Sequence, residues 1–392
     1  MSTRETRSEV PTGQARGVWS RQMMLLLATT FGVFSGFYLL LSVVPQFAAA
    51  NGAAEALAGA TTGVYMFATV GLQVFMPRLL ARFGYRTLVV TGAVLLGAPA
   101  LLLIASSRID VVLAVSAVRG LGFGIVTVAC AALVAELVPP RLRGKGSGLY
   151  GGAVGLAGLG ALPLGVWMAE HLGYETVFLT AGLVPLVSLF AAVGLSAPRP
   201  ERDREAGGLL RAFRTGGLRR PFLVLTVSAV ASGTVVTFLP LAVTGAGAVL
   251  VPAALLAQQA FATGGRWAAG LLGDRFGNGR LLVPAVVSAG TGVGAVVLGD
   301  QPLVLLTGMI LFGLGFGVVQ NATLVIMFQR VERRNYGLAS TQWNIGFDAG
   351  TGLGAVAIGL VVQQAGYGAG FTVVALLVLA VLPAAWPDRA AR

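Results

Sequence analysis

The sequence predicts an all-α membrane protein with twelve transmembrane helices, built as two parallel six-helix repeats. Three observations predict this fold class. Of the 392 residues, 56% are hydrophobic and 11% are charged, against roughly 45–50% and about 25% in soluble globular domains. Nine intervals without Asp, Glu, Lys or Arg each reach the length of about 18 residues that marks a spanning helix. Finally, short strings recur in the two halves of the chain at a constant offset of 193 residues.

The composition excludes several other classes of protein. Apolar runs such as 222 to 239 lack the alternating polarity of barrel strands, which leaves helices as the spanning elements. The single Cys130 and the single His171 exclude a disulfide framework and a multi-histidine metal centre. We therefore expect no cofactor, no metal and no enzymatic activity.

The predicted helices follow the charge-free intervals, two of which are long enough to be divided. The interval 221 to 265 divides at Gly245, Gly247 and Pro252, and the segment after Gly337 divides near Gly366 and Gly368. The approximate helix limits are 22 to 47, 57 to 77, 87 to 106, 111 to 135, 146 to 169, 176 to 197, 221 to 243, 252 to 273, 281 to 299, 303 to 328, 338 to 362 and 369 to 386. The predicted domains are a tail 1–21, an N-terminal bundle 22–197, a linker 198–220, a C-terminal bundle 221–387 and a tail 388–392.

The basic residues predict the orientation. Of the 27 Lys and Arg, only Arg108 falls in an odd-numbered loop, and Arg119 and Arg266 fall within helices. The other 24 lie in the termini or the even-numbered loops, which the positive-inside rule places in the cytoplasm. The net charge of +12 therefore requires no nucleic acid. The polar linker is expected to lie on anionic lipid headgroups.

The constant offset indicates a tandem duplication of a six-helix unit. The matched strings are Arg82-Phe83-Gly84 with Arg275-Phe276-Gly277, Gly120-Leu121-Gly122-Phe123-Gly124 with Gly313-Leu314-Gly315-Phe316-Gly317, and Gly173-Tyr174 with Gly366-Tyr367. Parallel six-helix repeats are typical of transporters that work by alternating access, in which the two halves rock about a site near the membrane midplane.

Over roughly residues 20 to 387 the chain resembles the major facilitator superfamily. The family pattern after helices 2 and 8 reads Gly-x-Leu-x-Asp-Arg-x-Gly followed by basic residues. The second copy here has Gly270, Leu272, Asp274, Arg275, Gly277 and Arg280, whereas the first copy has Pro77 and Ala81 for the glycine and aspartate and keeps Arg82, Gly84 and Arg86. The resemblance implies that these residues gate the conformational change. A simple basic turn is the alternative for the first copy.

Two further helices bear on the resemblance. Arg119 followed by Gly120, Gly122 and Gly124 is similar to the family's arginine-glycine motif in helix 4, which implies proton coupling in an exporter. In helix 5 the antiporter signature ends Gly-Pro-x-x-Gly-Gly, and this chain departs from that spacing. No Walker lysine pattern follows any glycine, so an ion gradient, rather than ATP, is the expected energy source.

Three charged residues lie within predicted helices, where a charge costs about 3 kcal/mol on insertion scales. Asp348 is ten residues into its helix and is predicted to load and release a proton. Arg119 is predicted to neutralise Asp348, to receive an anionic substrate group, or to reach the membrane surface with its long side chain. Arg266 is assigned to conformational gating, either with the cytoplasmic charges near Asp274 or with a contact to substrate.

A polar and aromatic set is predicted to line the substrate cavity. Its members are Tyr38, Tyr150, Phe238, Gln258, Gln320, Asn321, Gln342, Trp343 and Asn344. For any single amide, a hydrogen bond between helices is the alternative, worth only about 0.6 kcal/mol on average.

The sequence thus predicts a secondary transporter that exports a small amphipathic or aromatic compound in exchange for protons. Its apolar cavity candidates favour this function over the alternative, a proton-coupled importer of a sugar or organic anion. The expected partners are a small molecule, protons and the lipid bilayer, and the expected state is a monomer. Because 26 of the 27 basic residues are arginine, a GC-rich bacterial genome and a bacterial plasma membrane are expected, with both termini cytoplasmic.

Overall fold

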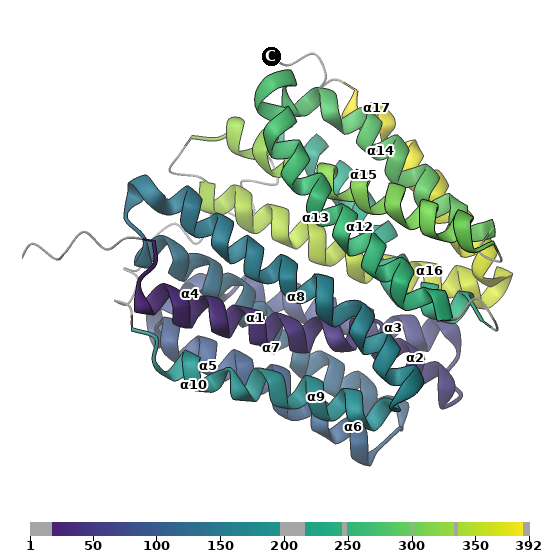
Figure 1. Ribbon diagram of the computed structural model, residues 1–392, viewed down its shortest axis with the longest axis horizontal. Coiled ribbons are helices and arrows are strands. Elements are labelled where there is room, and N and C mark those ends of the chain that lie inside the picture. The colour runs from purple at the N-terminus through teal and green to yellow at the C-terminus, as the bar shows by residue number, and fades with distance from the viewer. Residues whose placement is uncertain (1–17, 197–215, 245–248, 299–300, 333–335, 387–392) are drawn as a thin grey trace, which may run out of the picture.

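The computed structural model describes residues 18–196, 216–244, 249–298, 301–332 and 336–386, and the elements formed by these residues are all helices (Figure 1). The first half contains α1 (Arg21–Leu41), α2 (Val43–Ala50), α3 (Glu55–Gln73), α4 (Met76–Phe83), α5 (Tyr85–Gly97), η1 (Ala98–Leu101), α6 (Leu102–Ala105), α7 (Ile109–Leu137), η2 (Pro140–Leu142), α8 (Arg143–His171), α9 (Tyr174–Val187) and α10 (Leu189–Val193). The second half contains α12 (Gly216–Ala242), α13 (Val251–Phe276), α14 (Asn278–Gly294), η4 (Ala295–Leu298), α15 (Pro302–Gln329), α16 (Tyr336–Ala380) and α17 (Leu382–Ala385). The predicted linker up to residue 215 and the division at Gly245 and Gly247 lie outside the described residues.

Nine helical segments of the described residues are long and apolar enough to cross a membrane, and α3 with α4, bent by 62° at their junction, make a tenth. Two further features bring the number of long rods to twelve. The helix α16 counts as two rods, because the positive φ of Gly366 turns the chain back and Gly370 packs against Val362 and Ile358. The 26-residue α13 adds the last rod. The predicted all-α membrane fold is confirmed.

The helix α3 ends earlier than predicted. A single helix was expected over 57 to 77, but α3 stops at Gln73 and α4 begins at Met76. Pro77 in the first turn of α4 explains the break, because it has no amide hydrogen to donate to the carbonyl of Gln73 and its ring crowds that carbonyl, whereas proline is tolerated where a new helix begins. The prediction of one straight helix was therefore wrong.

The repeat is visible in the positions of the helices. The helices α7 and α8 begin at residues 109 and 143, and their counterparts α15 and α16 begin at 302 and 336, 193 residues later in both cases. The turn glycines follow the same offset: Gly84 and Gly277 have φ of 77° and 85°, and Gly173 and Gly366 have φ of 84° and 82°. Only glycine adopts this left-handed region without strain. The duplication therefore preserves the sharp turns as well as the helices.

The same glycines hold equivalent helices together in each half. A Cβ on Gly120 would collide with the carbonyl oxygen of Tyr65, and one on Gly313 with the carbonyl oxygen of Gln258. Tyr65 and Gln258 are themselves 193 residues apart. The helix α7 thus touches α3 as α15 touches α13, through glycines that let the backbones meet.

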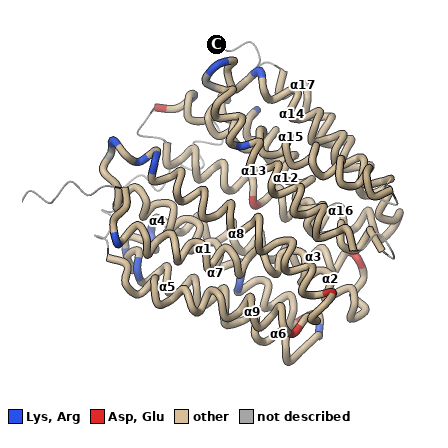
Figure 2. Tube along the Cα trace, viewed as in Figure 1, with Lys and Arg blue, Asp and Glu red and all other residues tan. Residues whose placement is uncertain are grey.

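The two halves join along two seams (Figure 1). In the first seam, α3 packs on α16, and in the second seam, α8 packs on α13. Figure 2 shows Lys and Arg gathered at one end of the bundle, which we call the basic end. Its basic residues include Arg82 and Arg86 at the turn from α4 to α5, Arg143 at the start of α8 and Arg275 in the last turn of α13. Away from this end the first seam is tight: a Cβ on Gly59 would collide with the carbonyl oxygen of Ala355.

At the basic end the halves separate. Among the described residues, no heavy atom lies within 4 Å of a Cβ built on Gly148 or Gly152 of α8, or on Gly270 of α13. At the opposite end the hydroxyl of Thr237 on α12 donates to that of Thr62 on α3 at 3.3 Å. The structure is therefore closed at the opposite end and open at the basic end.

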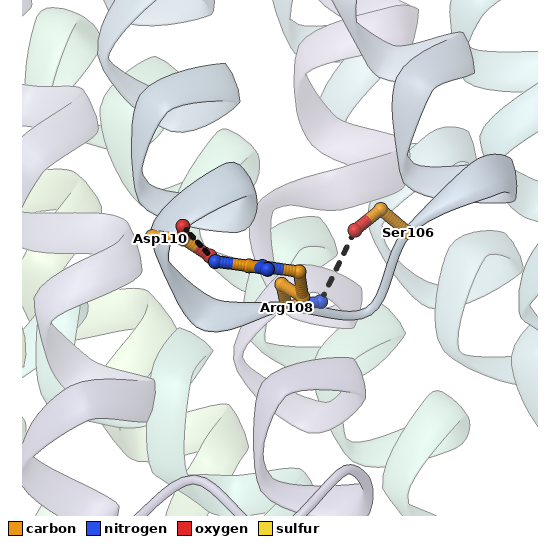
Figure 3. Close-up of polar contacts among 3 residues, drawn as sticks. All are labelled: Ser106, Arg108 and Asp110. Atoms are coloured by element: carbon orange, nitrogen blue, oxygen red, sulfur yellow. Dashed lines mark hydrogen bonds and ion pairs between the residues drawn. The ribbon is translucent and has the colours of Figure 1, made fainter.

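Arg108, the basic residue in an odd-numbered loop, forms an ion pair with Asp110, two residues further along the chain (Figure 3). Its Nε and Nη2 donate to the two carboxylate oxygens of Asp110 at 3.1 and 2.9 Å, and its backbone amide donates to the hydroxyl of Ser106 at 3.4 Å. These hydrogen bonds to Asp110 raise the pKa of Arg108 above its ordinary value.

Candidate functional site

Asp348 is buried in the first seam and is held by a residue of the other half. Its side chain is 5% exposed, and its Oδ2 accepts a hydrogen bond of 2.8 Å from Nε2 of Gln73 on α3. Gln73 is 2% exposed, and its Nε2 also lies 3.5 Å from the hydroxyl oxygen of Thr127 on α7. The carboxylate therefore contacts the N-terminal half through one neutral donor.

This hydrogen bond lies where α3 ends, on the basic-end side of the close contacts between α3 and α16. Toward the opposite end, Gly352 packs on Met66, and Gly63 would collide with Val356 if it carried a Cβ. Gln73 is the last residue of α3, and the chain then bends into α4. Rocking of the halves that opens this seam must separate Gln73 from Asp348.

Arg119 is buried inside the N-terminal half and bonds to backbone. It is 3% exposed, its Nε donates to the carbonyl oxygen of Leu96 at 3.1 Å, and its Nη2 donates to that of Gly36 at 3.1 Å. Its guanidinium also lies 5.6 Å from the ring centre of Tyr65, within the range of a cation–π contact. The structure therefore does not bring Arg119 to Asp348 as an ion pair, since carbonyls of α5 and α1 take its donors.

A small, partly open cavity adjoins Arg119. It is lined by Phe37, Leu40, Leu41, Val44, Pro45, Thr61, Thr62, Tyr65, Ser116 and Arg119. Of the residues assigned to the site from the sequence, Arg119 lines this cavity. Its wall is mostly apolar and aromatic, with one cation.

Arg266 lies in the second seam and is half-buried. Its Nη1 donates to Oε1 of Gln320 on α15 at 2.8 Å, and its Nη2 donates to the hydroxyl of Thr263 at 3.0 Å. Asp274 is eight residues further along α13, about 12 Å along the helix axis, and its side chain lies outside the described residues. The described contacts of Arg266 are thus to neutral groups near the middle of the bundle.

The predicted cavity residues other than Phe238 lie in the interior of the bundle, buried or partly buried. They are Tyr38, Tyr150, Gln258, Gln320, Asn321, Gln342, Trp343 and Asn344. Trp343 donates from Nε1 to the hydroxyl of Thr323 at 3.1 Å, and Asn344 donates to the carbonyl oxygen of Ser340 in its own helix. The side-chain oxygens of Gln258, Asn321 and Gln342 are buried without a hydrogen-bond partner. Phe238 is fully buried and packs between Gly59 and Gly359, so in this conformation it fills the closed end.

The predicted gating residues lie at the basic end. Arg82 and Arg275 occupy the last turns of α4 and α13, and each guanidinium lies 5.2 Å from the ring centre of the next phenylalanine. Arg86 is exposed at the start of α5, and Gly270 has open space beside it. The repeat places these residues in equivalent turns, where Gly84 and Gly277 reverse the chain.

Two residues of the site were missed from the sequence. Gln73 and Thr127 are polar residues in apolar helices and carry no charge, so the search for buried charges passed over them. The repeat offset contains the signal that would have found them, since 193 residues separate Gln73 from Arg266 and Thr127 from Gln320.

Comparison with known proteins agrees with this architecture. A profile described as "Major Facilitator Superfamily" matches residues 26–347. The purine ribonucleoside efflux pumps NepI of Shigella sonnei (strain Ss046) and of Escherichia coli (strain K12) are each 29% identical over 153 residues, which is 39% of this chain. The match likewise spans only 39% of the length of these curated relatives.

The solved structures give the wider fold. The crystal structure of the nucleoside transporter NupG aligns with a TM-score of 0.72 over 95% of this chain and 100% of that one, at 14% identity. At this identity the likeness establishes the fold alone. Because the profile matches most of the chain, the protein belongs to the major facilitator superfamily.

Proposed function

We propose that the protein exports a small amphipathic compound with an aromatic or heteroaromatic ring in exchange for protons. Asp348 takes up and releases the proton. The single observation that carries the proposal is the hydrogen bond from Gln73 to Asp348, which joins the two halves at the limit of the closed seam.

The contact links protonation to movement. A charged carboxylate accepts the amide hydrogen of Gln73 strongly, because hydrogen bonds to ionised groups are about twice as strong as neutral ones. Protonation weakens this bond and lowers the cost of leaving the carboxyl in an apolar seam. The proton on Asp348 therefore shifts the balance between the conformations with this seam closed and open.

Arg119 enters the proposal as a positioning residue. It ties α7 to α5 and α1 through two carbonyls and stands beside Tyr65, at the wall of the cavity. Its charge favours a substrate with an electron-rich ring or an acceptor group. The similarity to purine ribonucleoside efflux pumps makes inosine and guanosine the first compounds to test.

The same proposal includes orientation and setting. The basic end faces the cytoplasm of a bacterial plasma membrane, and both termini lie on that side. The distribution of Lys and Arg in Figure 2 supports this orientation. The protein acts as a monomer, with protons as the coupling ion.

Transport into everted membrane vesicles tests the function. We expect inosine, guanosine or an aromatic amphiphile such as ethidium to accumulate when a proton gradient is imposed, and accumulation to collapse with a protonophore. Asp348→Asn is expected to reduce gradient-driven uptake at least tenfold, whereas Asp348→Glu keeps part of it. Asp110→Asn, in the exposed pair with Arg108, is the matched control and should transport as the wild type does.

Two outcomes would contradict the proposal. Uptake that persists in Asp348→Asn and ignores the protonophore would remove Asp348 from coupling. Accumulation of the same compounds by intact cells would reverse the direction and favour the importer of a sugar or organic anion.

A further inference from the structure

The two seams contain equivalent positions with different chemistry. Adding 193 to Gln73, Thr127 and Gly155 gives Arg266, Gln320 and Asp348. The contacts follow the same correspondence. In the first seam Gln73 reaches Thr127 and Asp348, and in the second seam Arg266 donates to Gln320 while facing Gly155.

Gly155 leaves a gap where the first seam has a carboxylate. A Cβ built on Gly155 would lie 4.0 Å from Nη2 of Arg266 and 3.9 Å from the Thr263 side chain. These are ordinary van der Waals distances, so a side chain fits there. The guanidinium of Arg266 therefore faces Gly155, whereas the equivalent position in the first seam has the carboxylate of Asp348.

Within the described part of the chain, the hydrogen-bond partners of Arg266 are neutral. Gln320 and Thr263 each supply one neutral oxygen to a group with five N–H donors. Two turns away on α13, about 12 Å along the helix axis, the side-chain oxygen of Gln258, which is 2% exposed, is buried without a hydrogen-bond partner among the described residues. A buried polar atom with no partner is costly unless a ligand or water satisfies it.

The second seam is open on the approach to Arg266. Gly148, Gly152 and Gly155 recur on one face of α8, and open space adjoins the first two. On the other side of Gly155, a Cβ on Gly158 would contact the ring of Tyr38 and Nε2 of Gln259 at 3.0 Å. A molecule that enters from the basic end would thus meet Arg266 first and an aromatic ring and an amide beyond it.

We propose that Arg266, Gln320 and the gap at Gly155 form a subsite for an oxyanion, the carboxylate or phosphate group of a transported molecule. The oxyanion takes the place that the Asp348 carboxylate takes in the first seam. A planar guanidinium matches such a group with two parallel hydrogen bonds. This deepens the proposed function by naming a charged group on the substrate.

Binding of a matched pair of probes tests the subsite. The purified protein is titrated with 2-naphthoate and with 2-naphthamide, which share the ring and differ in the charge, and affinity is read from the shift in Tm or by calorimetry. We expect about tenfold tighter binding of the naphthoate, in line with a charge-assisted hydrogen bond. Equal affinity for the two probes, or binding of neither, would overturn the proposal.

The variants exchange residues between the repeats. Arg266→Gln gives the second seam the residue that the first seam has at the equivalent position, Gln73. Gly155→Asp gives the second seam a carboxylate equivalent to that of Asp348. Both should bring the two affinities within twofold of each other, while binding of 2-naphthamide shows that the variant is folded. Gly155→Asn has the size of Gly155→Asp without the charge and should keep most of the preference. A preference that survives Gly155→Asp and Arg266→Gln would contradict the subsite.

A measurement without ligand gives a second check. Gly155→Asp should raise the Tm of the wild type by pairing with Arg266 and should lower it in the Arg266→Gln background, where the new carboxylate is unpaired. An equal effect in both backgrounds would show that Arg266 does not face this position.

The binding test is separate from the transport test. Binding uses no gradient and no direction of transport, so loss of proton coupling in vesicles leaves the probe preference standing. Conversely, proton-driven export of inosine together with equal binding of the two probes would keep the proposed function and remove the oxyanion subsite.

Discussion

The two halves of the molecule share a backbone but differ in their buried polar side chains. The glycine contacts are the same in both: Gly124 approaches the carbonyl of Thr69 as Gly317 approaches that of Ala262. The polar positions differ. Arg119 in the first half corresponds to the buried Phe312 in the second. Packing has thus kept the symmetry of the duplication, and the charged groups mark the places where it has been lost.

This comparison explains where function resides. A transporter needs two similar halves so that both conformations are of nearly equal energy, and this follows from a repeated scaffold. Chemistry needs particular groups at particular places, and a buried charge is too costly to keep without a use. Asp348, Arg119 and Arg266 are each found in one half only, which separates them from the scaffold.

The largest expected effect comes from breaking the shared scaffold. Gly317→Leu should abolish the folded protein, because even a Cβ there would collide with the carbonyl oxygen of Ala262, with a cost at the upper end of the range of about 1–3 kcal/mol or more that overpacking brings. Size-exclusion chromatography of the solubilised protein is the measurement. Gly160→Leu on exposed α8 surface, with no atom within 4 Å of its Cβ, should elute as the wild type does. Equal behaviour of the two variants would show that the α13 and α15 backbones do not meet at Gly317.

An intermediate effect, on transport, is expected when the first seam is given the arginine that the second seam has at the equivalent position. Gln73→Arg places a guanidinium beside the Asp348 carboxylate and should hold the seam closed with an ion pair between the halves. We expect transport in vesicles to fall at least tenfold with no loss of Tm.

The control for this variant is Gln73→Leu, which removes the donor without adding charge. It should lower the Tm by a few degrees, as expected for a buried hydrogen bond worth about 1 kcal/mol. Transport at the wild-type rate in Gln73→Arg would mean that the contact with Asp348 does not open during the cycle.

The smallest effect on stability is expected at Arg119. Arg119→Met fills a similar volume and removes a buried charge that bonds only to carbonyls already engaged in helices. Replacing a buried charge by an apolar group of similar size is often neutral, so we expect a Tm within about 2 °C of the wild type and a large loss of transport. A fall in Tm that accounts for the lost transport would make Arg119 a structural residue.

Much of the fold was predictable from the sequence. Exclusion of charge from long segments predicted the spans, since a bilayer tolerates few unpaired charges. The strings around Gly84, Gly122 and Gly173 predicted the duplication, and their counterparts occupy equivalent turns and contacts in the structure. Patterns of this kind are local, so one chain is enough to read them.

The site was predictable only in part. Asp348, Arg119 and Arg266 were found as buried charges, but their partners were not. Neutralising Asp348 was one of three roles expected of Arg119, which instead donates to the carbonyls of Leu96 and Gly36. Which helices are neighbours decides such contacts, and helical periodicity in a uniformly apolar segment does not reveal it. The role of each residue stays a prediction.

The pair of Arg108 and Asp110 bears on how the chain enters the membrane. During biosynthesis the loop that holds Arg108 must pass through the bilayer in the proposed orientation, against the preference of a free cation for the cytoplasm. The two bonds to Asp110 make the segment locally neutral, and both residues lie within three positions of each other. In the proposed orientation this short-range pair would offset the charge of Arg108 without help from any other part of the chain.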